Sequence, residues 1–309
     1  MAPFRFALQC SGAASAAAWQ ALARKAEDLG YSTLYVPDHL EDQWAPLPAL
    51  VVAAAATSTL RVGTLVLDND FRHPVVLAKE AATMDVVTEG RFELGMGAGW
   101  LRVDYETSGI PMDPPAVRVE RLAESLEIMQ SLWATGRTTF SGTHYRVHEA
   151  VGSPAPHTAG GPPLAIGGGS RRILELAARQ AEVVSIVPSL AAGALGRDTA
   201  AESVVEKYRQ RVEWVRAAAG DRAETLELQC WTATVQVVPN GDEVVHNLAP
   251  VFGLSPEQVR AAPLVLIGSA PEIAETLRQR RETLGFSNIV VHEPEMDALA
   301  PVIAELAGT

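Results

Sequence analysis

The sequence has few lysines, little positive charge and no long apolar run. Lys25, Lys79 and Lys207 are the only lysines, and the formal net charge is −12. Nucleic-acid phosphates are bound by basic surfaces, so this balance argues against a nucleic-acid partner. The longest apolar run, residues 49–56, is much shorter than the roughly 20 residues that span a bilayer. The sequence therefore predicts a cytoplasmic protein with no membrane partner.

Cysteine is also scarce, because Cys10 and Cys230 are the only two in 309 residues. Both lie in apolar segments that resemble strands, so two buried, reduced thiols are expected rather than a disulfide framework. Hydrophobic residues make up 48% of the chain and charged residues 20%, as in ordinary globular proteins with a large core.

Strand-like runs alternate with helical patterns along the whole chain, which is typical of a parallel sheet built from βα units. The expected strands are Phe4–Cys10, Thr33–Val36, Arg61–Leu67, Phe92–Met96, Leu164–Ile166, Val183–Val187, Leu226–Val238 and Asn288–His292. Eight such units in about 300 residues favour a closed (β/α)8 TIM barrel, an α/β fold, over an open doubly wound sheet. We expect residues 1–309 to form one domain.

One long insertion and two helix starts can also be identified in the sequence. The Pro- and Gly-rich segment 100–163 is too long for a normal βα loop, and we interpret it as a partly helical insertion between strands four and five, on the active-site rim. Ser255 and Ser269 each stand three residues before a Gln or Glu, which predicts two capped helix starts.

Polar or glycine-rich groups follow four successive strands. Barrel enzymes assemble their reactive site at the carboxyl ends of the strands, so these groups are expected to converge. They are Pro37-Asp38-His39, Asp68-Asn69-Asp70, Gly97-Ala98-Gly99-Trp100 and Gly167-Gly168-Gly169-Ser170-Arg171.

The glycine run lies between a short strand and a helix. Its backbone N–H groups could approach a phosphate at the positive end of that helix, with Arg171 or Arg172 adding charge. A tight strand-to-helix turn is the alternative, and the position at the barrel rim favours phosphate.

His39 could relay a proton to a redox ring or substrate, although a lone histidine is more often structural. Asn69 and Asp70 could simply cap a turn. Trp44 and Trp100 could stack over a planar cofactor or serve packing alone.

The spacing of three further histidines does not indicate a metal centre. His144, His148 and His157 are loosely spaced and lack a carboxylate at metal-ligand spacing. No metal site is predicted.

Five motifs follow one another along the chain. They are Tyr35–His39, Leu60–Leu67, Asp70–Pro74, Gly90–Trp100 and Ile166–Gly169. Read together, this ordered set resembles the luciferase-like monooxygenase family, and more narrowly its branch that depends on coenzyme F420, a deazaflavin. The resemblance runs from Phe4 to about Leu306.

The resemblance implies a barrel that holds the deazaflavin ring at its carboxyl mouth, with His39 beside the ring and the cofactor phosphate at the glycine run. It also implies an irregular peptide, often a non-proline cis bond, around Leu67 to Asn69. The cofactor-binding residues are then His39, Leu67, Asp68, Asn69, Gly97, Gly99, Gly167, Gly168, Gly169, Ser170 and Arg171. Relatives often form dimers, so the resemblance also suggests a homodimer.

The proton donor is the point at which this sequence departs from the family pattern. Some relatives carry a Glu just beyond the fourth strand, whereas here Trp100 comes first and the acids follow at Asp104 and Glu106. The catalytic candidates are therefore His39, Asp38, Trp100 and Asp104.

Three functions remain open from sequence. The first is hydride transfer between F420 and a small organic substrate, by reduction of a C=C or C=N bond or oxidation of an alcohol. The second is an FMN-dependent monooxygenase; the Arg-rich composition favours the deazaflavin over FMN. The third is a barrel that binds a cofactor or partner without catalysis.

Overall fold

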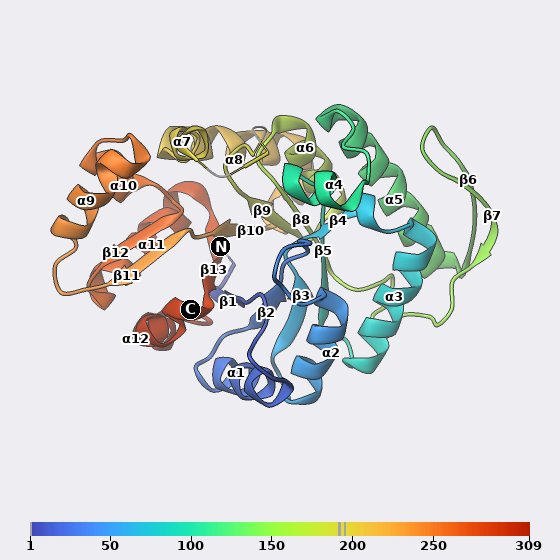
Figure 1. Cartoon of the computed structure of the whole chain (residues 1–309), viewed down its shortest axis with the longest axis horizontal. Helices are drawn as coiled ribbons and strands as arrows, with labels where there is room; N and C mark the ends of the chain where they lie inside the picture. Colours follow the sequence, from blue (N-terminus) through green and yellow to red (C-terminus); the bar gives the residue numbers. More distant parts are fainter. Residues whose placement is uncertain (1, 191–192, 195) are drawn as a thin grey trace.

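A closed parallel barrel forms the centre of the molecule, shown in Figure 1. The computed structural model describes residues 2–190, 193–194 and 196–309. The ring runs β1 (Arg5–Gln9), β2 (Thr33–Val36), β3 (Arg61–Thr64), β5 (Phe92–Gly97), β8 (Leu164–Gly168), β9 (Val183–Ile186), β10 (Glu227–Trp231) and β13 (Phe286–His292), which pairs with β1 again. The predicted (β/α)8 barrel is confirmed.

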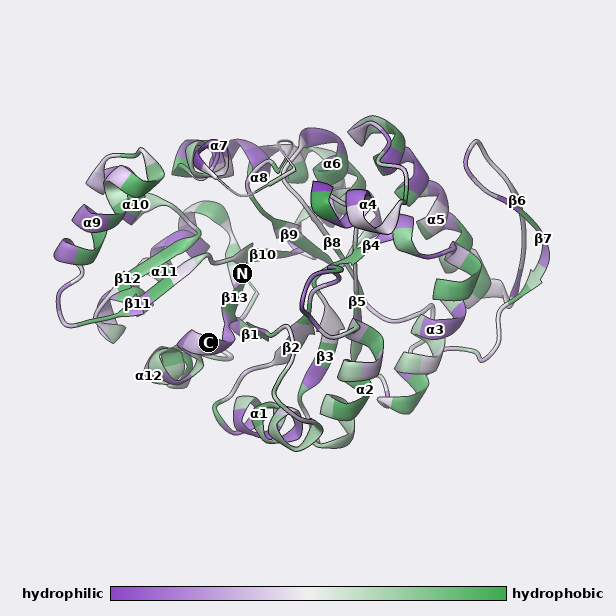
Figure 2. Cartoon of the chain, viewed as in Figure 1, coloured by the Kyte–Doolittle hydropathy of each residue, from purple (hydrophilic) through white to green (hydrophobic). Residues whose placement is uncertain are grey.

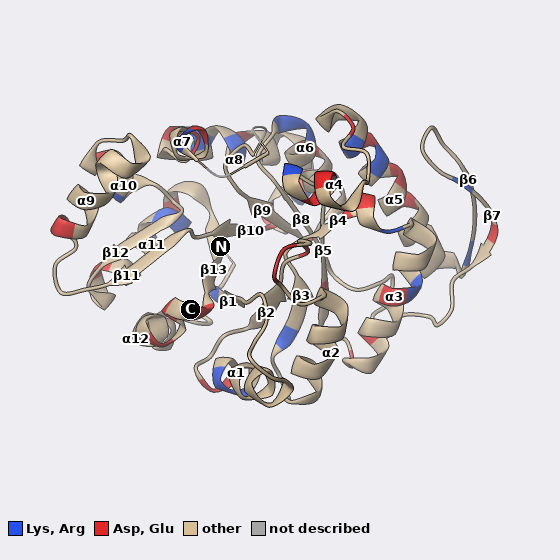
Figure 3. Ribbon diagram, viewed as in Figure 1, with Lys and Arg blue, Asp and Glu red and all other residues tan. Residues whose placement is uncertain are grey.

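Helices cover the outside of the ring with their apolar faces inward. Figure 2 shows the barrel strands as largely hydrophobic, and Figure 3 shows acidic and basic residues gathered mainly on the outer helices. These helices are α1 (Ala16–Asp28), α2 (Pro46–Ala55), α3 (Pro74–Val87), α5 (Pro115–Thr135), α6 (Arg171–Gln180), α8 (Val205–Ala219), α11 (Ala270–Leu284) and α12 (Met296–Leu306). Shorter helical turns are α4 (Arg102–Ser108), α7 (Arg197–Ala201), η1 (Asn69–Phe71), η2 (Gly220–Glu224) and η3 (Glu293–Glu295).

Two predicted strands are each broken in the structure. The third, expected over Arg61–Leu67, stops at Thr64 and resumes as β4 (Leu67–Asp68). A cis peptide bond joins Leu65 to Val66, two residues before the segment in which the family resemblance placed an irregular peptide.

The seventh, expected over Leu226–Val238, leaves the barrel after β10. Its second half is β11 (Thr234–Val237), which pairs with β12 (Val265–Gly268), a strand that was not predicted. Together with α9 (Asp242–Phe252) and α10 (Pro256–Ala261), these strands form a lobe beside the barrel, and this lobe has a small apolar core of its own. The helix starts predicted at Ser255 and Ser269 are confirmed, since both form capping boxes.

The insertion between β5 and β8 is only partly as expected. Of its elements, α4 lies near the strand ends, whereas α5 packs against α3 as an ordinary outer helix of the barrel. The antiparallel hairpin of β6 (Arg137–Ser141) and β7 (Arg146–Val151) lies on the opposite side of the molecule from α9 and α10 (Figure 1). Tyr145, in the turn of the hairpin, lies 3.4 Å from Asn69 after β4, and the rim position of the whole segment stays a prediction.

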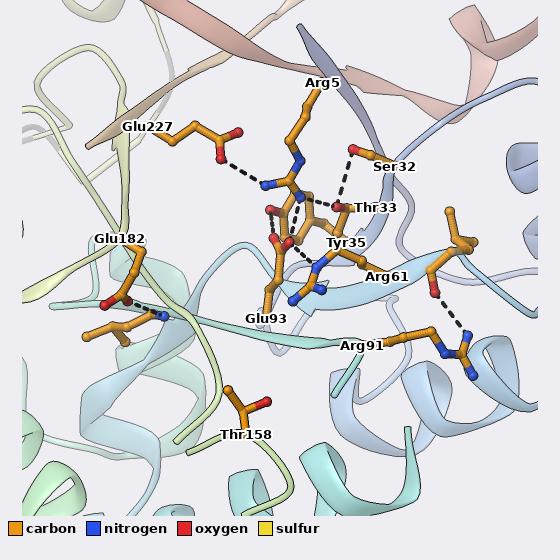
Figure 4. A network of polar contacts seen from close by, with 12 residues as sticks. Arg5, Ser32, Thr33, Tyr35, Arg61, Arg91, Glu93, Thr158, Glu182 and Glu227 are labelled. Carbon is orange, nitrogen blue, oxygen red and sulfur yellow. Dashed lines mark hydrogen bonds and ion pairs between the residues drawn. The ribbon is translucent and has the colours of Figure 1, made fainter. Parts of the chain in front are cut away.

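A buried polar network fills the end of the barrel where the strands begin (Figure 4). Glu93 accepts hydrogen bonds from Arg5 at 2.5 Å, Arg61 at 2.5 Å and the Tyr35 hydroxyl at 2.6 Å. Arg5 also pairs with Glu227 at 2.9 Å. Because these side chains bond to one another and fill this end of the barrel, we call it the closed end.

Candidate functional site

A cavity of about 760 Å³ opens where the barrel strands end. This volume is within the range of about 300–1,000 Å³ that is usual for small-molecule sites. Its walls come from loops after β1, β2, β5, β8, β9 and β10, from α4 and α5, and from the lobe of α9 and α10. The predicted convergence of the strand ends is thus present.

Leu65 and Val66 form an apolar part of the cavity lining, which we call its floor. Val66 occupies the space beside two glycines. A Cβ at Gly97 would lie 2.6 Å from Val66 Cγ2, and one at Gly167 would lie 3.2 Å from Val66 Cγ1. Glycine at these two positions therefore lets the chain around Val66 lie close to β5 and β8.

His39 is held by an acid from the insertion. Its Nδ1 lies 2.7 Å from Oδ2 of Asp104, and Oδ1 of Asp104 accepts the Leu40 N–H at 3.0 Å. Asp104 is buried, and the Trp100 ring meets the imidazole edge-on at a centroid distance of 5.6 Å. A carboxylate that accepts both bonds fixes the proton on Nδ1 and leaves Nε2 able to accept another. The structure brings His39, Trp100 and Asp104 together, while Glu106 is exposed.

Asp38 also lines the cavity, but its carboxylate has other partners. Arg72 donates to both of its oxygens, at 2.5 and 3.0 Å, and the Asp68 N–H donates to Oδ2 at 3.1 Å. A bidentate arginine pair neutralises the carboxylate and positions the β2 and β4 ends. Asp38 therefore orients the loop that carries His39.

The glycine run borders the cavity at the start of α6. Gly167, Gly168, Gly169 and Ser170 all line it, and the Ser170 side chain makes no capping hydrogen bond to α6. A Cβ would collide with Ile173 at Gly168 and with the Pro188 carbonyl oxygen at Gly169. The glycine run therefore forms a tight strand-to-helix turn, and the start of α6 borders the cavity without a side-chain cap. The two interpretations of this run, a tight turn and a phosphate site, are compatible.

Three predicted cofactor-binding residues lie outside the cavity. Leu67 is fully buried in the barrel core, and Asn69 is buried with its Nδ2 3.4 Å from the Tyr145 hydroxyl. Arg171 points outward from the first turn of α6, with 69% of its side chain exposed, and pairs with Glu175. Among the other residues considered, Trp44 packs against Trp19.

Comparison with known proteins agrees with this geometry. The family model described as luciferase-like monooxygenase matches residues 1–288. This chain belongs to the luciferase-like monooxygenase family. An F420-dependent glucose-6-phosphate dehydrogenase from Microbacterium testaceum (strain StLB037) is 28% identical over 296 residues, which cover 88% of this chain and 86% of the relative.

A 4-hydroxyprotoasukamycin monooxygenase from Streptomyces nodosus subsp. asukaensis is 26% identical over 302 residues, which cover 88% of this chain and 78% of the relative. The coenzyme F420-dependent tetrahydromethanopterin reductase from Methanopyrus kandleri superposes with a TM-score of 0.77 over 99% of both chains, at 16% identity. That structural likeness supports the same fold.

Several cavity residues of this luciferase-like protein were missed in the sequence. Gln9 and Trp231 border the floor, and Trp231 Nε1 donates to Gln9 Oε1 at 2.6 Å. Arg118 of α5 donates to the carbonyl oxygens of Ala98 and Gly99, and so fixes the turn after β5. Gln9 and Trp231 end β1 and β10, so the rule applied to the other strand ends could have found them.

Across the described ranges, no group of three or more histidine, cysteine, aspartate or glutamate side chains is placed to hold a metal ion. Within the same residues, every helix is too short or too polar to cross a membrane.

Asp68 is a buried cavity acid whose pKa the fold changes strongly. Burial raises the pKa of Asp68 from 3.8 to about 6, although the Asp70 N–H and the Tyr105 hydroxyl both donate to its carboxylate. The folded state therefore binds this proton more tightly than the unfolded state between about pH 4 and 6, and ionisation in that window costs stability.

We expect Asp68→Asn to remove this cost. Relative to the unchanged protein, the free energy of unfolding of the variant should rise by up to about 3 kcal/mol as the pH increases from about 4 to 7. Urea unfolding at a series of pH values measures this difference, with Asp297→Asn as the matched exposed control. A constant difference across the pH range would contradict the raised pKa.

Proposed function

We propose that this chain is an oxidoreductase that transfers a hydride between the deazaflavin F420 and a small organic substrate. The observation that carries the proposal is the His39–Asp104 pair on the wall of a cavity that also contains the uncapped start of α6. The F420-dependent enzymes among the relatives support the same cofactor.

The residues present fit such a cofactor. The apolar floor of Leu65 and Val66 suits one face of a flat tricyclic ring, and Gln9 and Trp231 border it. The N–H groups at the start of α6 suit a phosphate, because a helix N-terminus carries partial positive charge. Gly169 is held in place by Arg211, which donates to its carbonyl at 3.0 Å.

When bound, a deazaflavin accepts or donates two electrons as a hydride. Oxidation of an alcohol to a carbonyl also releases the hydroxyl proton, and His39 would take it at Nε2. Reduction of a carbonyl requires the reverse, with His39 returning the proton. Asp104 would stabilise the imidazolium in both directions, as a carboxylate beside a catalytic histidine does.

Titration of the apoprotein with each cofactor tests the proposal. We expect F420 to change its absorbance spectrum on binding and to saturate at a lower concentration than FMN. Saturation by FMN alone would instead favour the second candidate, an FMN-dependent monooxygenase, which the 4-hydroxyprotoasukamycin monooxygenase among the relatives supports. Tight F420 binding without turnover of any alcohol, carbonyl or unsaturated compound would favour a non-catalytic protein.

We further propose that residues 1–309 form one domain and that the enzyme acts in the cytoplasm as a homodimer. One buried apolar cluster draws on residues from Phe4 to Leu306, which supports a single domain. The exposed valines Val76 and Val87 of α3 offer apolar area that a second copy could cover. Sedimentation equilibrium measures the assembly state directly.

A further inference from the structure

The turn between α9 and α10 has an unusual composition for an exposed connection. Val251 and Phe252 end α9, Gly253 reverses the chain with a φ of +67°, and Leu254 follows before the cap of α10. Val251 is 62% exposed. Turns are normally polar because their backbone and side chains meet water. Phe252 and Leu254 are partly buried against the small apolar core of the lobe, so the exposed Val251 is the side chain that requires another explanation.

These side chains line the same cavity as His39. Val251, Phe252 and Leu254 form its wall on the side of the lobe, together with Ala262 and Leu264 from the segment after α10. Leu190, from the loop after β9, adds another apolar side chain to the cavity. The volume of about 760 Å³ leaves room for a second small molecule beside a flat ring.

Few of the described residues that line the cavity are basic. They are His39, Arg118 and Arg197, and Arg197 is exposed at the start of α7. The guanidinium of Arg118 donates to the carbonyl oxygens of Ala98, Gly99 and Asp113, which leaves it committed to the backbone. A phosphorylated substrate would need charge-assisted hydrogen bonds of its own in addition to those that the cofactor phosphate takes.

We infer that the α9–α10 turn recognises the substrate, and that the substrate is an uncharged, apolar alcohol or carbonyl compound rather than a sugar phosphate. This inference rests on the proposed function for the chemistry, and on the turn itself for the specificity. The reacting carbon lies toward His39 and the apolar body of the substrate against Val251, Phe252 and Leu254. Burial of that body displaces water from Val251 and from the exposed parts of Phe252 and Leu254.

Val251→Asp tests the inference, with Val151→Asp as the matched control. Val151 lies on the β6–β7 hairpin and is 59% exposed, close to the 62% of Val251. With F420 bound, we expect Val251→Asp to raise the KM for 2-octanol by about tenfold with little change in kcat, because a carboxylate on the wall disfavours an apolar substrate. Phe252→Ala should raise the same KM, and glucose 6-phosphate should show a much lower kcat/KM than 2-octanol.

A binding measurement separates this inference from the proposed function. The neutral apolar dye Nile red should bind the apoprotein, and Val251→Asp, but not Val151→Asp, should weaken that binding about tenfold. If F420 does not bind while the dye result holds, the proposed cofactor is wrong and the apolar site stands. If F420 binds but the two variants behave alike toward dye and 2-octanol, or glucose 6-phosphate is the better substrate, the inference is overturned.

Discussion

Replacing His39 with alanine is expected to lower kcat by about 10²–10⁴-fold, the usual contribution of a positioned acid or base, while the Kd for F420 changes little. The reason is the geometry of the imidazole. Asp104 fixes its tautomer through Nδ1 at 2.7 Å, which leaves Nε2 for the substrate proton. The chain around His39 is held by bonds that do not involve its ring, since Arg72 binds Asp38 and Asp104 accepts the Leu40 N–H.

Single-turnover kinetics with F420 and an equilibrium titration of the same variant measure the two quantities separately. His148→Ala is the control, because His148 is exposed on β7 and outside the cavity. Asp104→Asn should lower kcat less than His39→Ala, since the imidazole remains but loses its anionic partner. A loss of kcat matched by an equal loss of cofactor affinity would show that His39 binds the cofactor rather than moves a proton.

The barrel and the place of its site could be predicted because both depend on local patterns. Alternating strands and helices predict a parallel barrel, and the carboxyl ends of its strands must share one mouth. His39, Gly97 and Gly167 follow directly from that reasoning, and the cavity contains all three. The helix starts at Ser255 and Ser269 could also be predicted, because each capping box is complete within four residues.

Asp104 was among the catalytic candidates, but its hydrogen bond to His39 could not be predicted in the same way. Asp104 is 65 residues further along the chain, in an insertion whose path no periodicity describes. Only the packing of α4 decides that Asp104, and not Glu106, turns inward. The direction of Arg171 could not be predicted either. The rotation of α6 about its axis places Ile173 toward the cavity and Arg171 toward solvent.

The lobe was missed because its first strand continues a barrel strand without a break in composition. Residues 226–238 are largely apolar or β-branched throughout, so the pattern indicates one strand. The change of direction is set by long-range contacts instead. The Thr232 hydroxyl donates to the Val290 carbonyl at 2.7 Å, and the chain then crosses to β12. The α9–α10 turn that we infer to recognise the substrate belongs to this lobe, so its place in the cavity could not be predicted from the sequence.

Replacing Glu93 is expected to have the largest effect on stability. Glu93 is almost fully buried and faces Arg5 and Arg61 at the closed end of the barrel (Figure 4). Glu93→Gln keeps the shape of the side chain but leaves both guanidinium groups without their shared anion. The loss of one partner from a buried charge network costs about 3–5 kcal/mol, which guanidinium chloride unfolding would detect as a lower midpoint.

The pH dependence of this loss identifies its cause. Burial alone would raise the pKa of Glu93, but the charges of Arg5 and Arg61 outweigh it and lower that pKa. A carboxyl whose pKa is lowered on folding stabilises the protein above its unfolded pKa and loses that contribution as the pH falls through the folded pKa. The difference in the free energy of unfolding between the unchanged protein and Glu93→Gln should therefore become smaller at acidic pH.

Glu120→Gln is the control, because Glu120 pairs with Arg172 and both side chains are more than half exposed. This substitution should lower the free energy of unfolding by less than about 1 kcal/mol. An equal effect of the two substitutions would show that the network at the closed end contributes no more than an exposed surface pair.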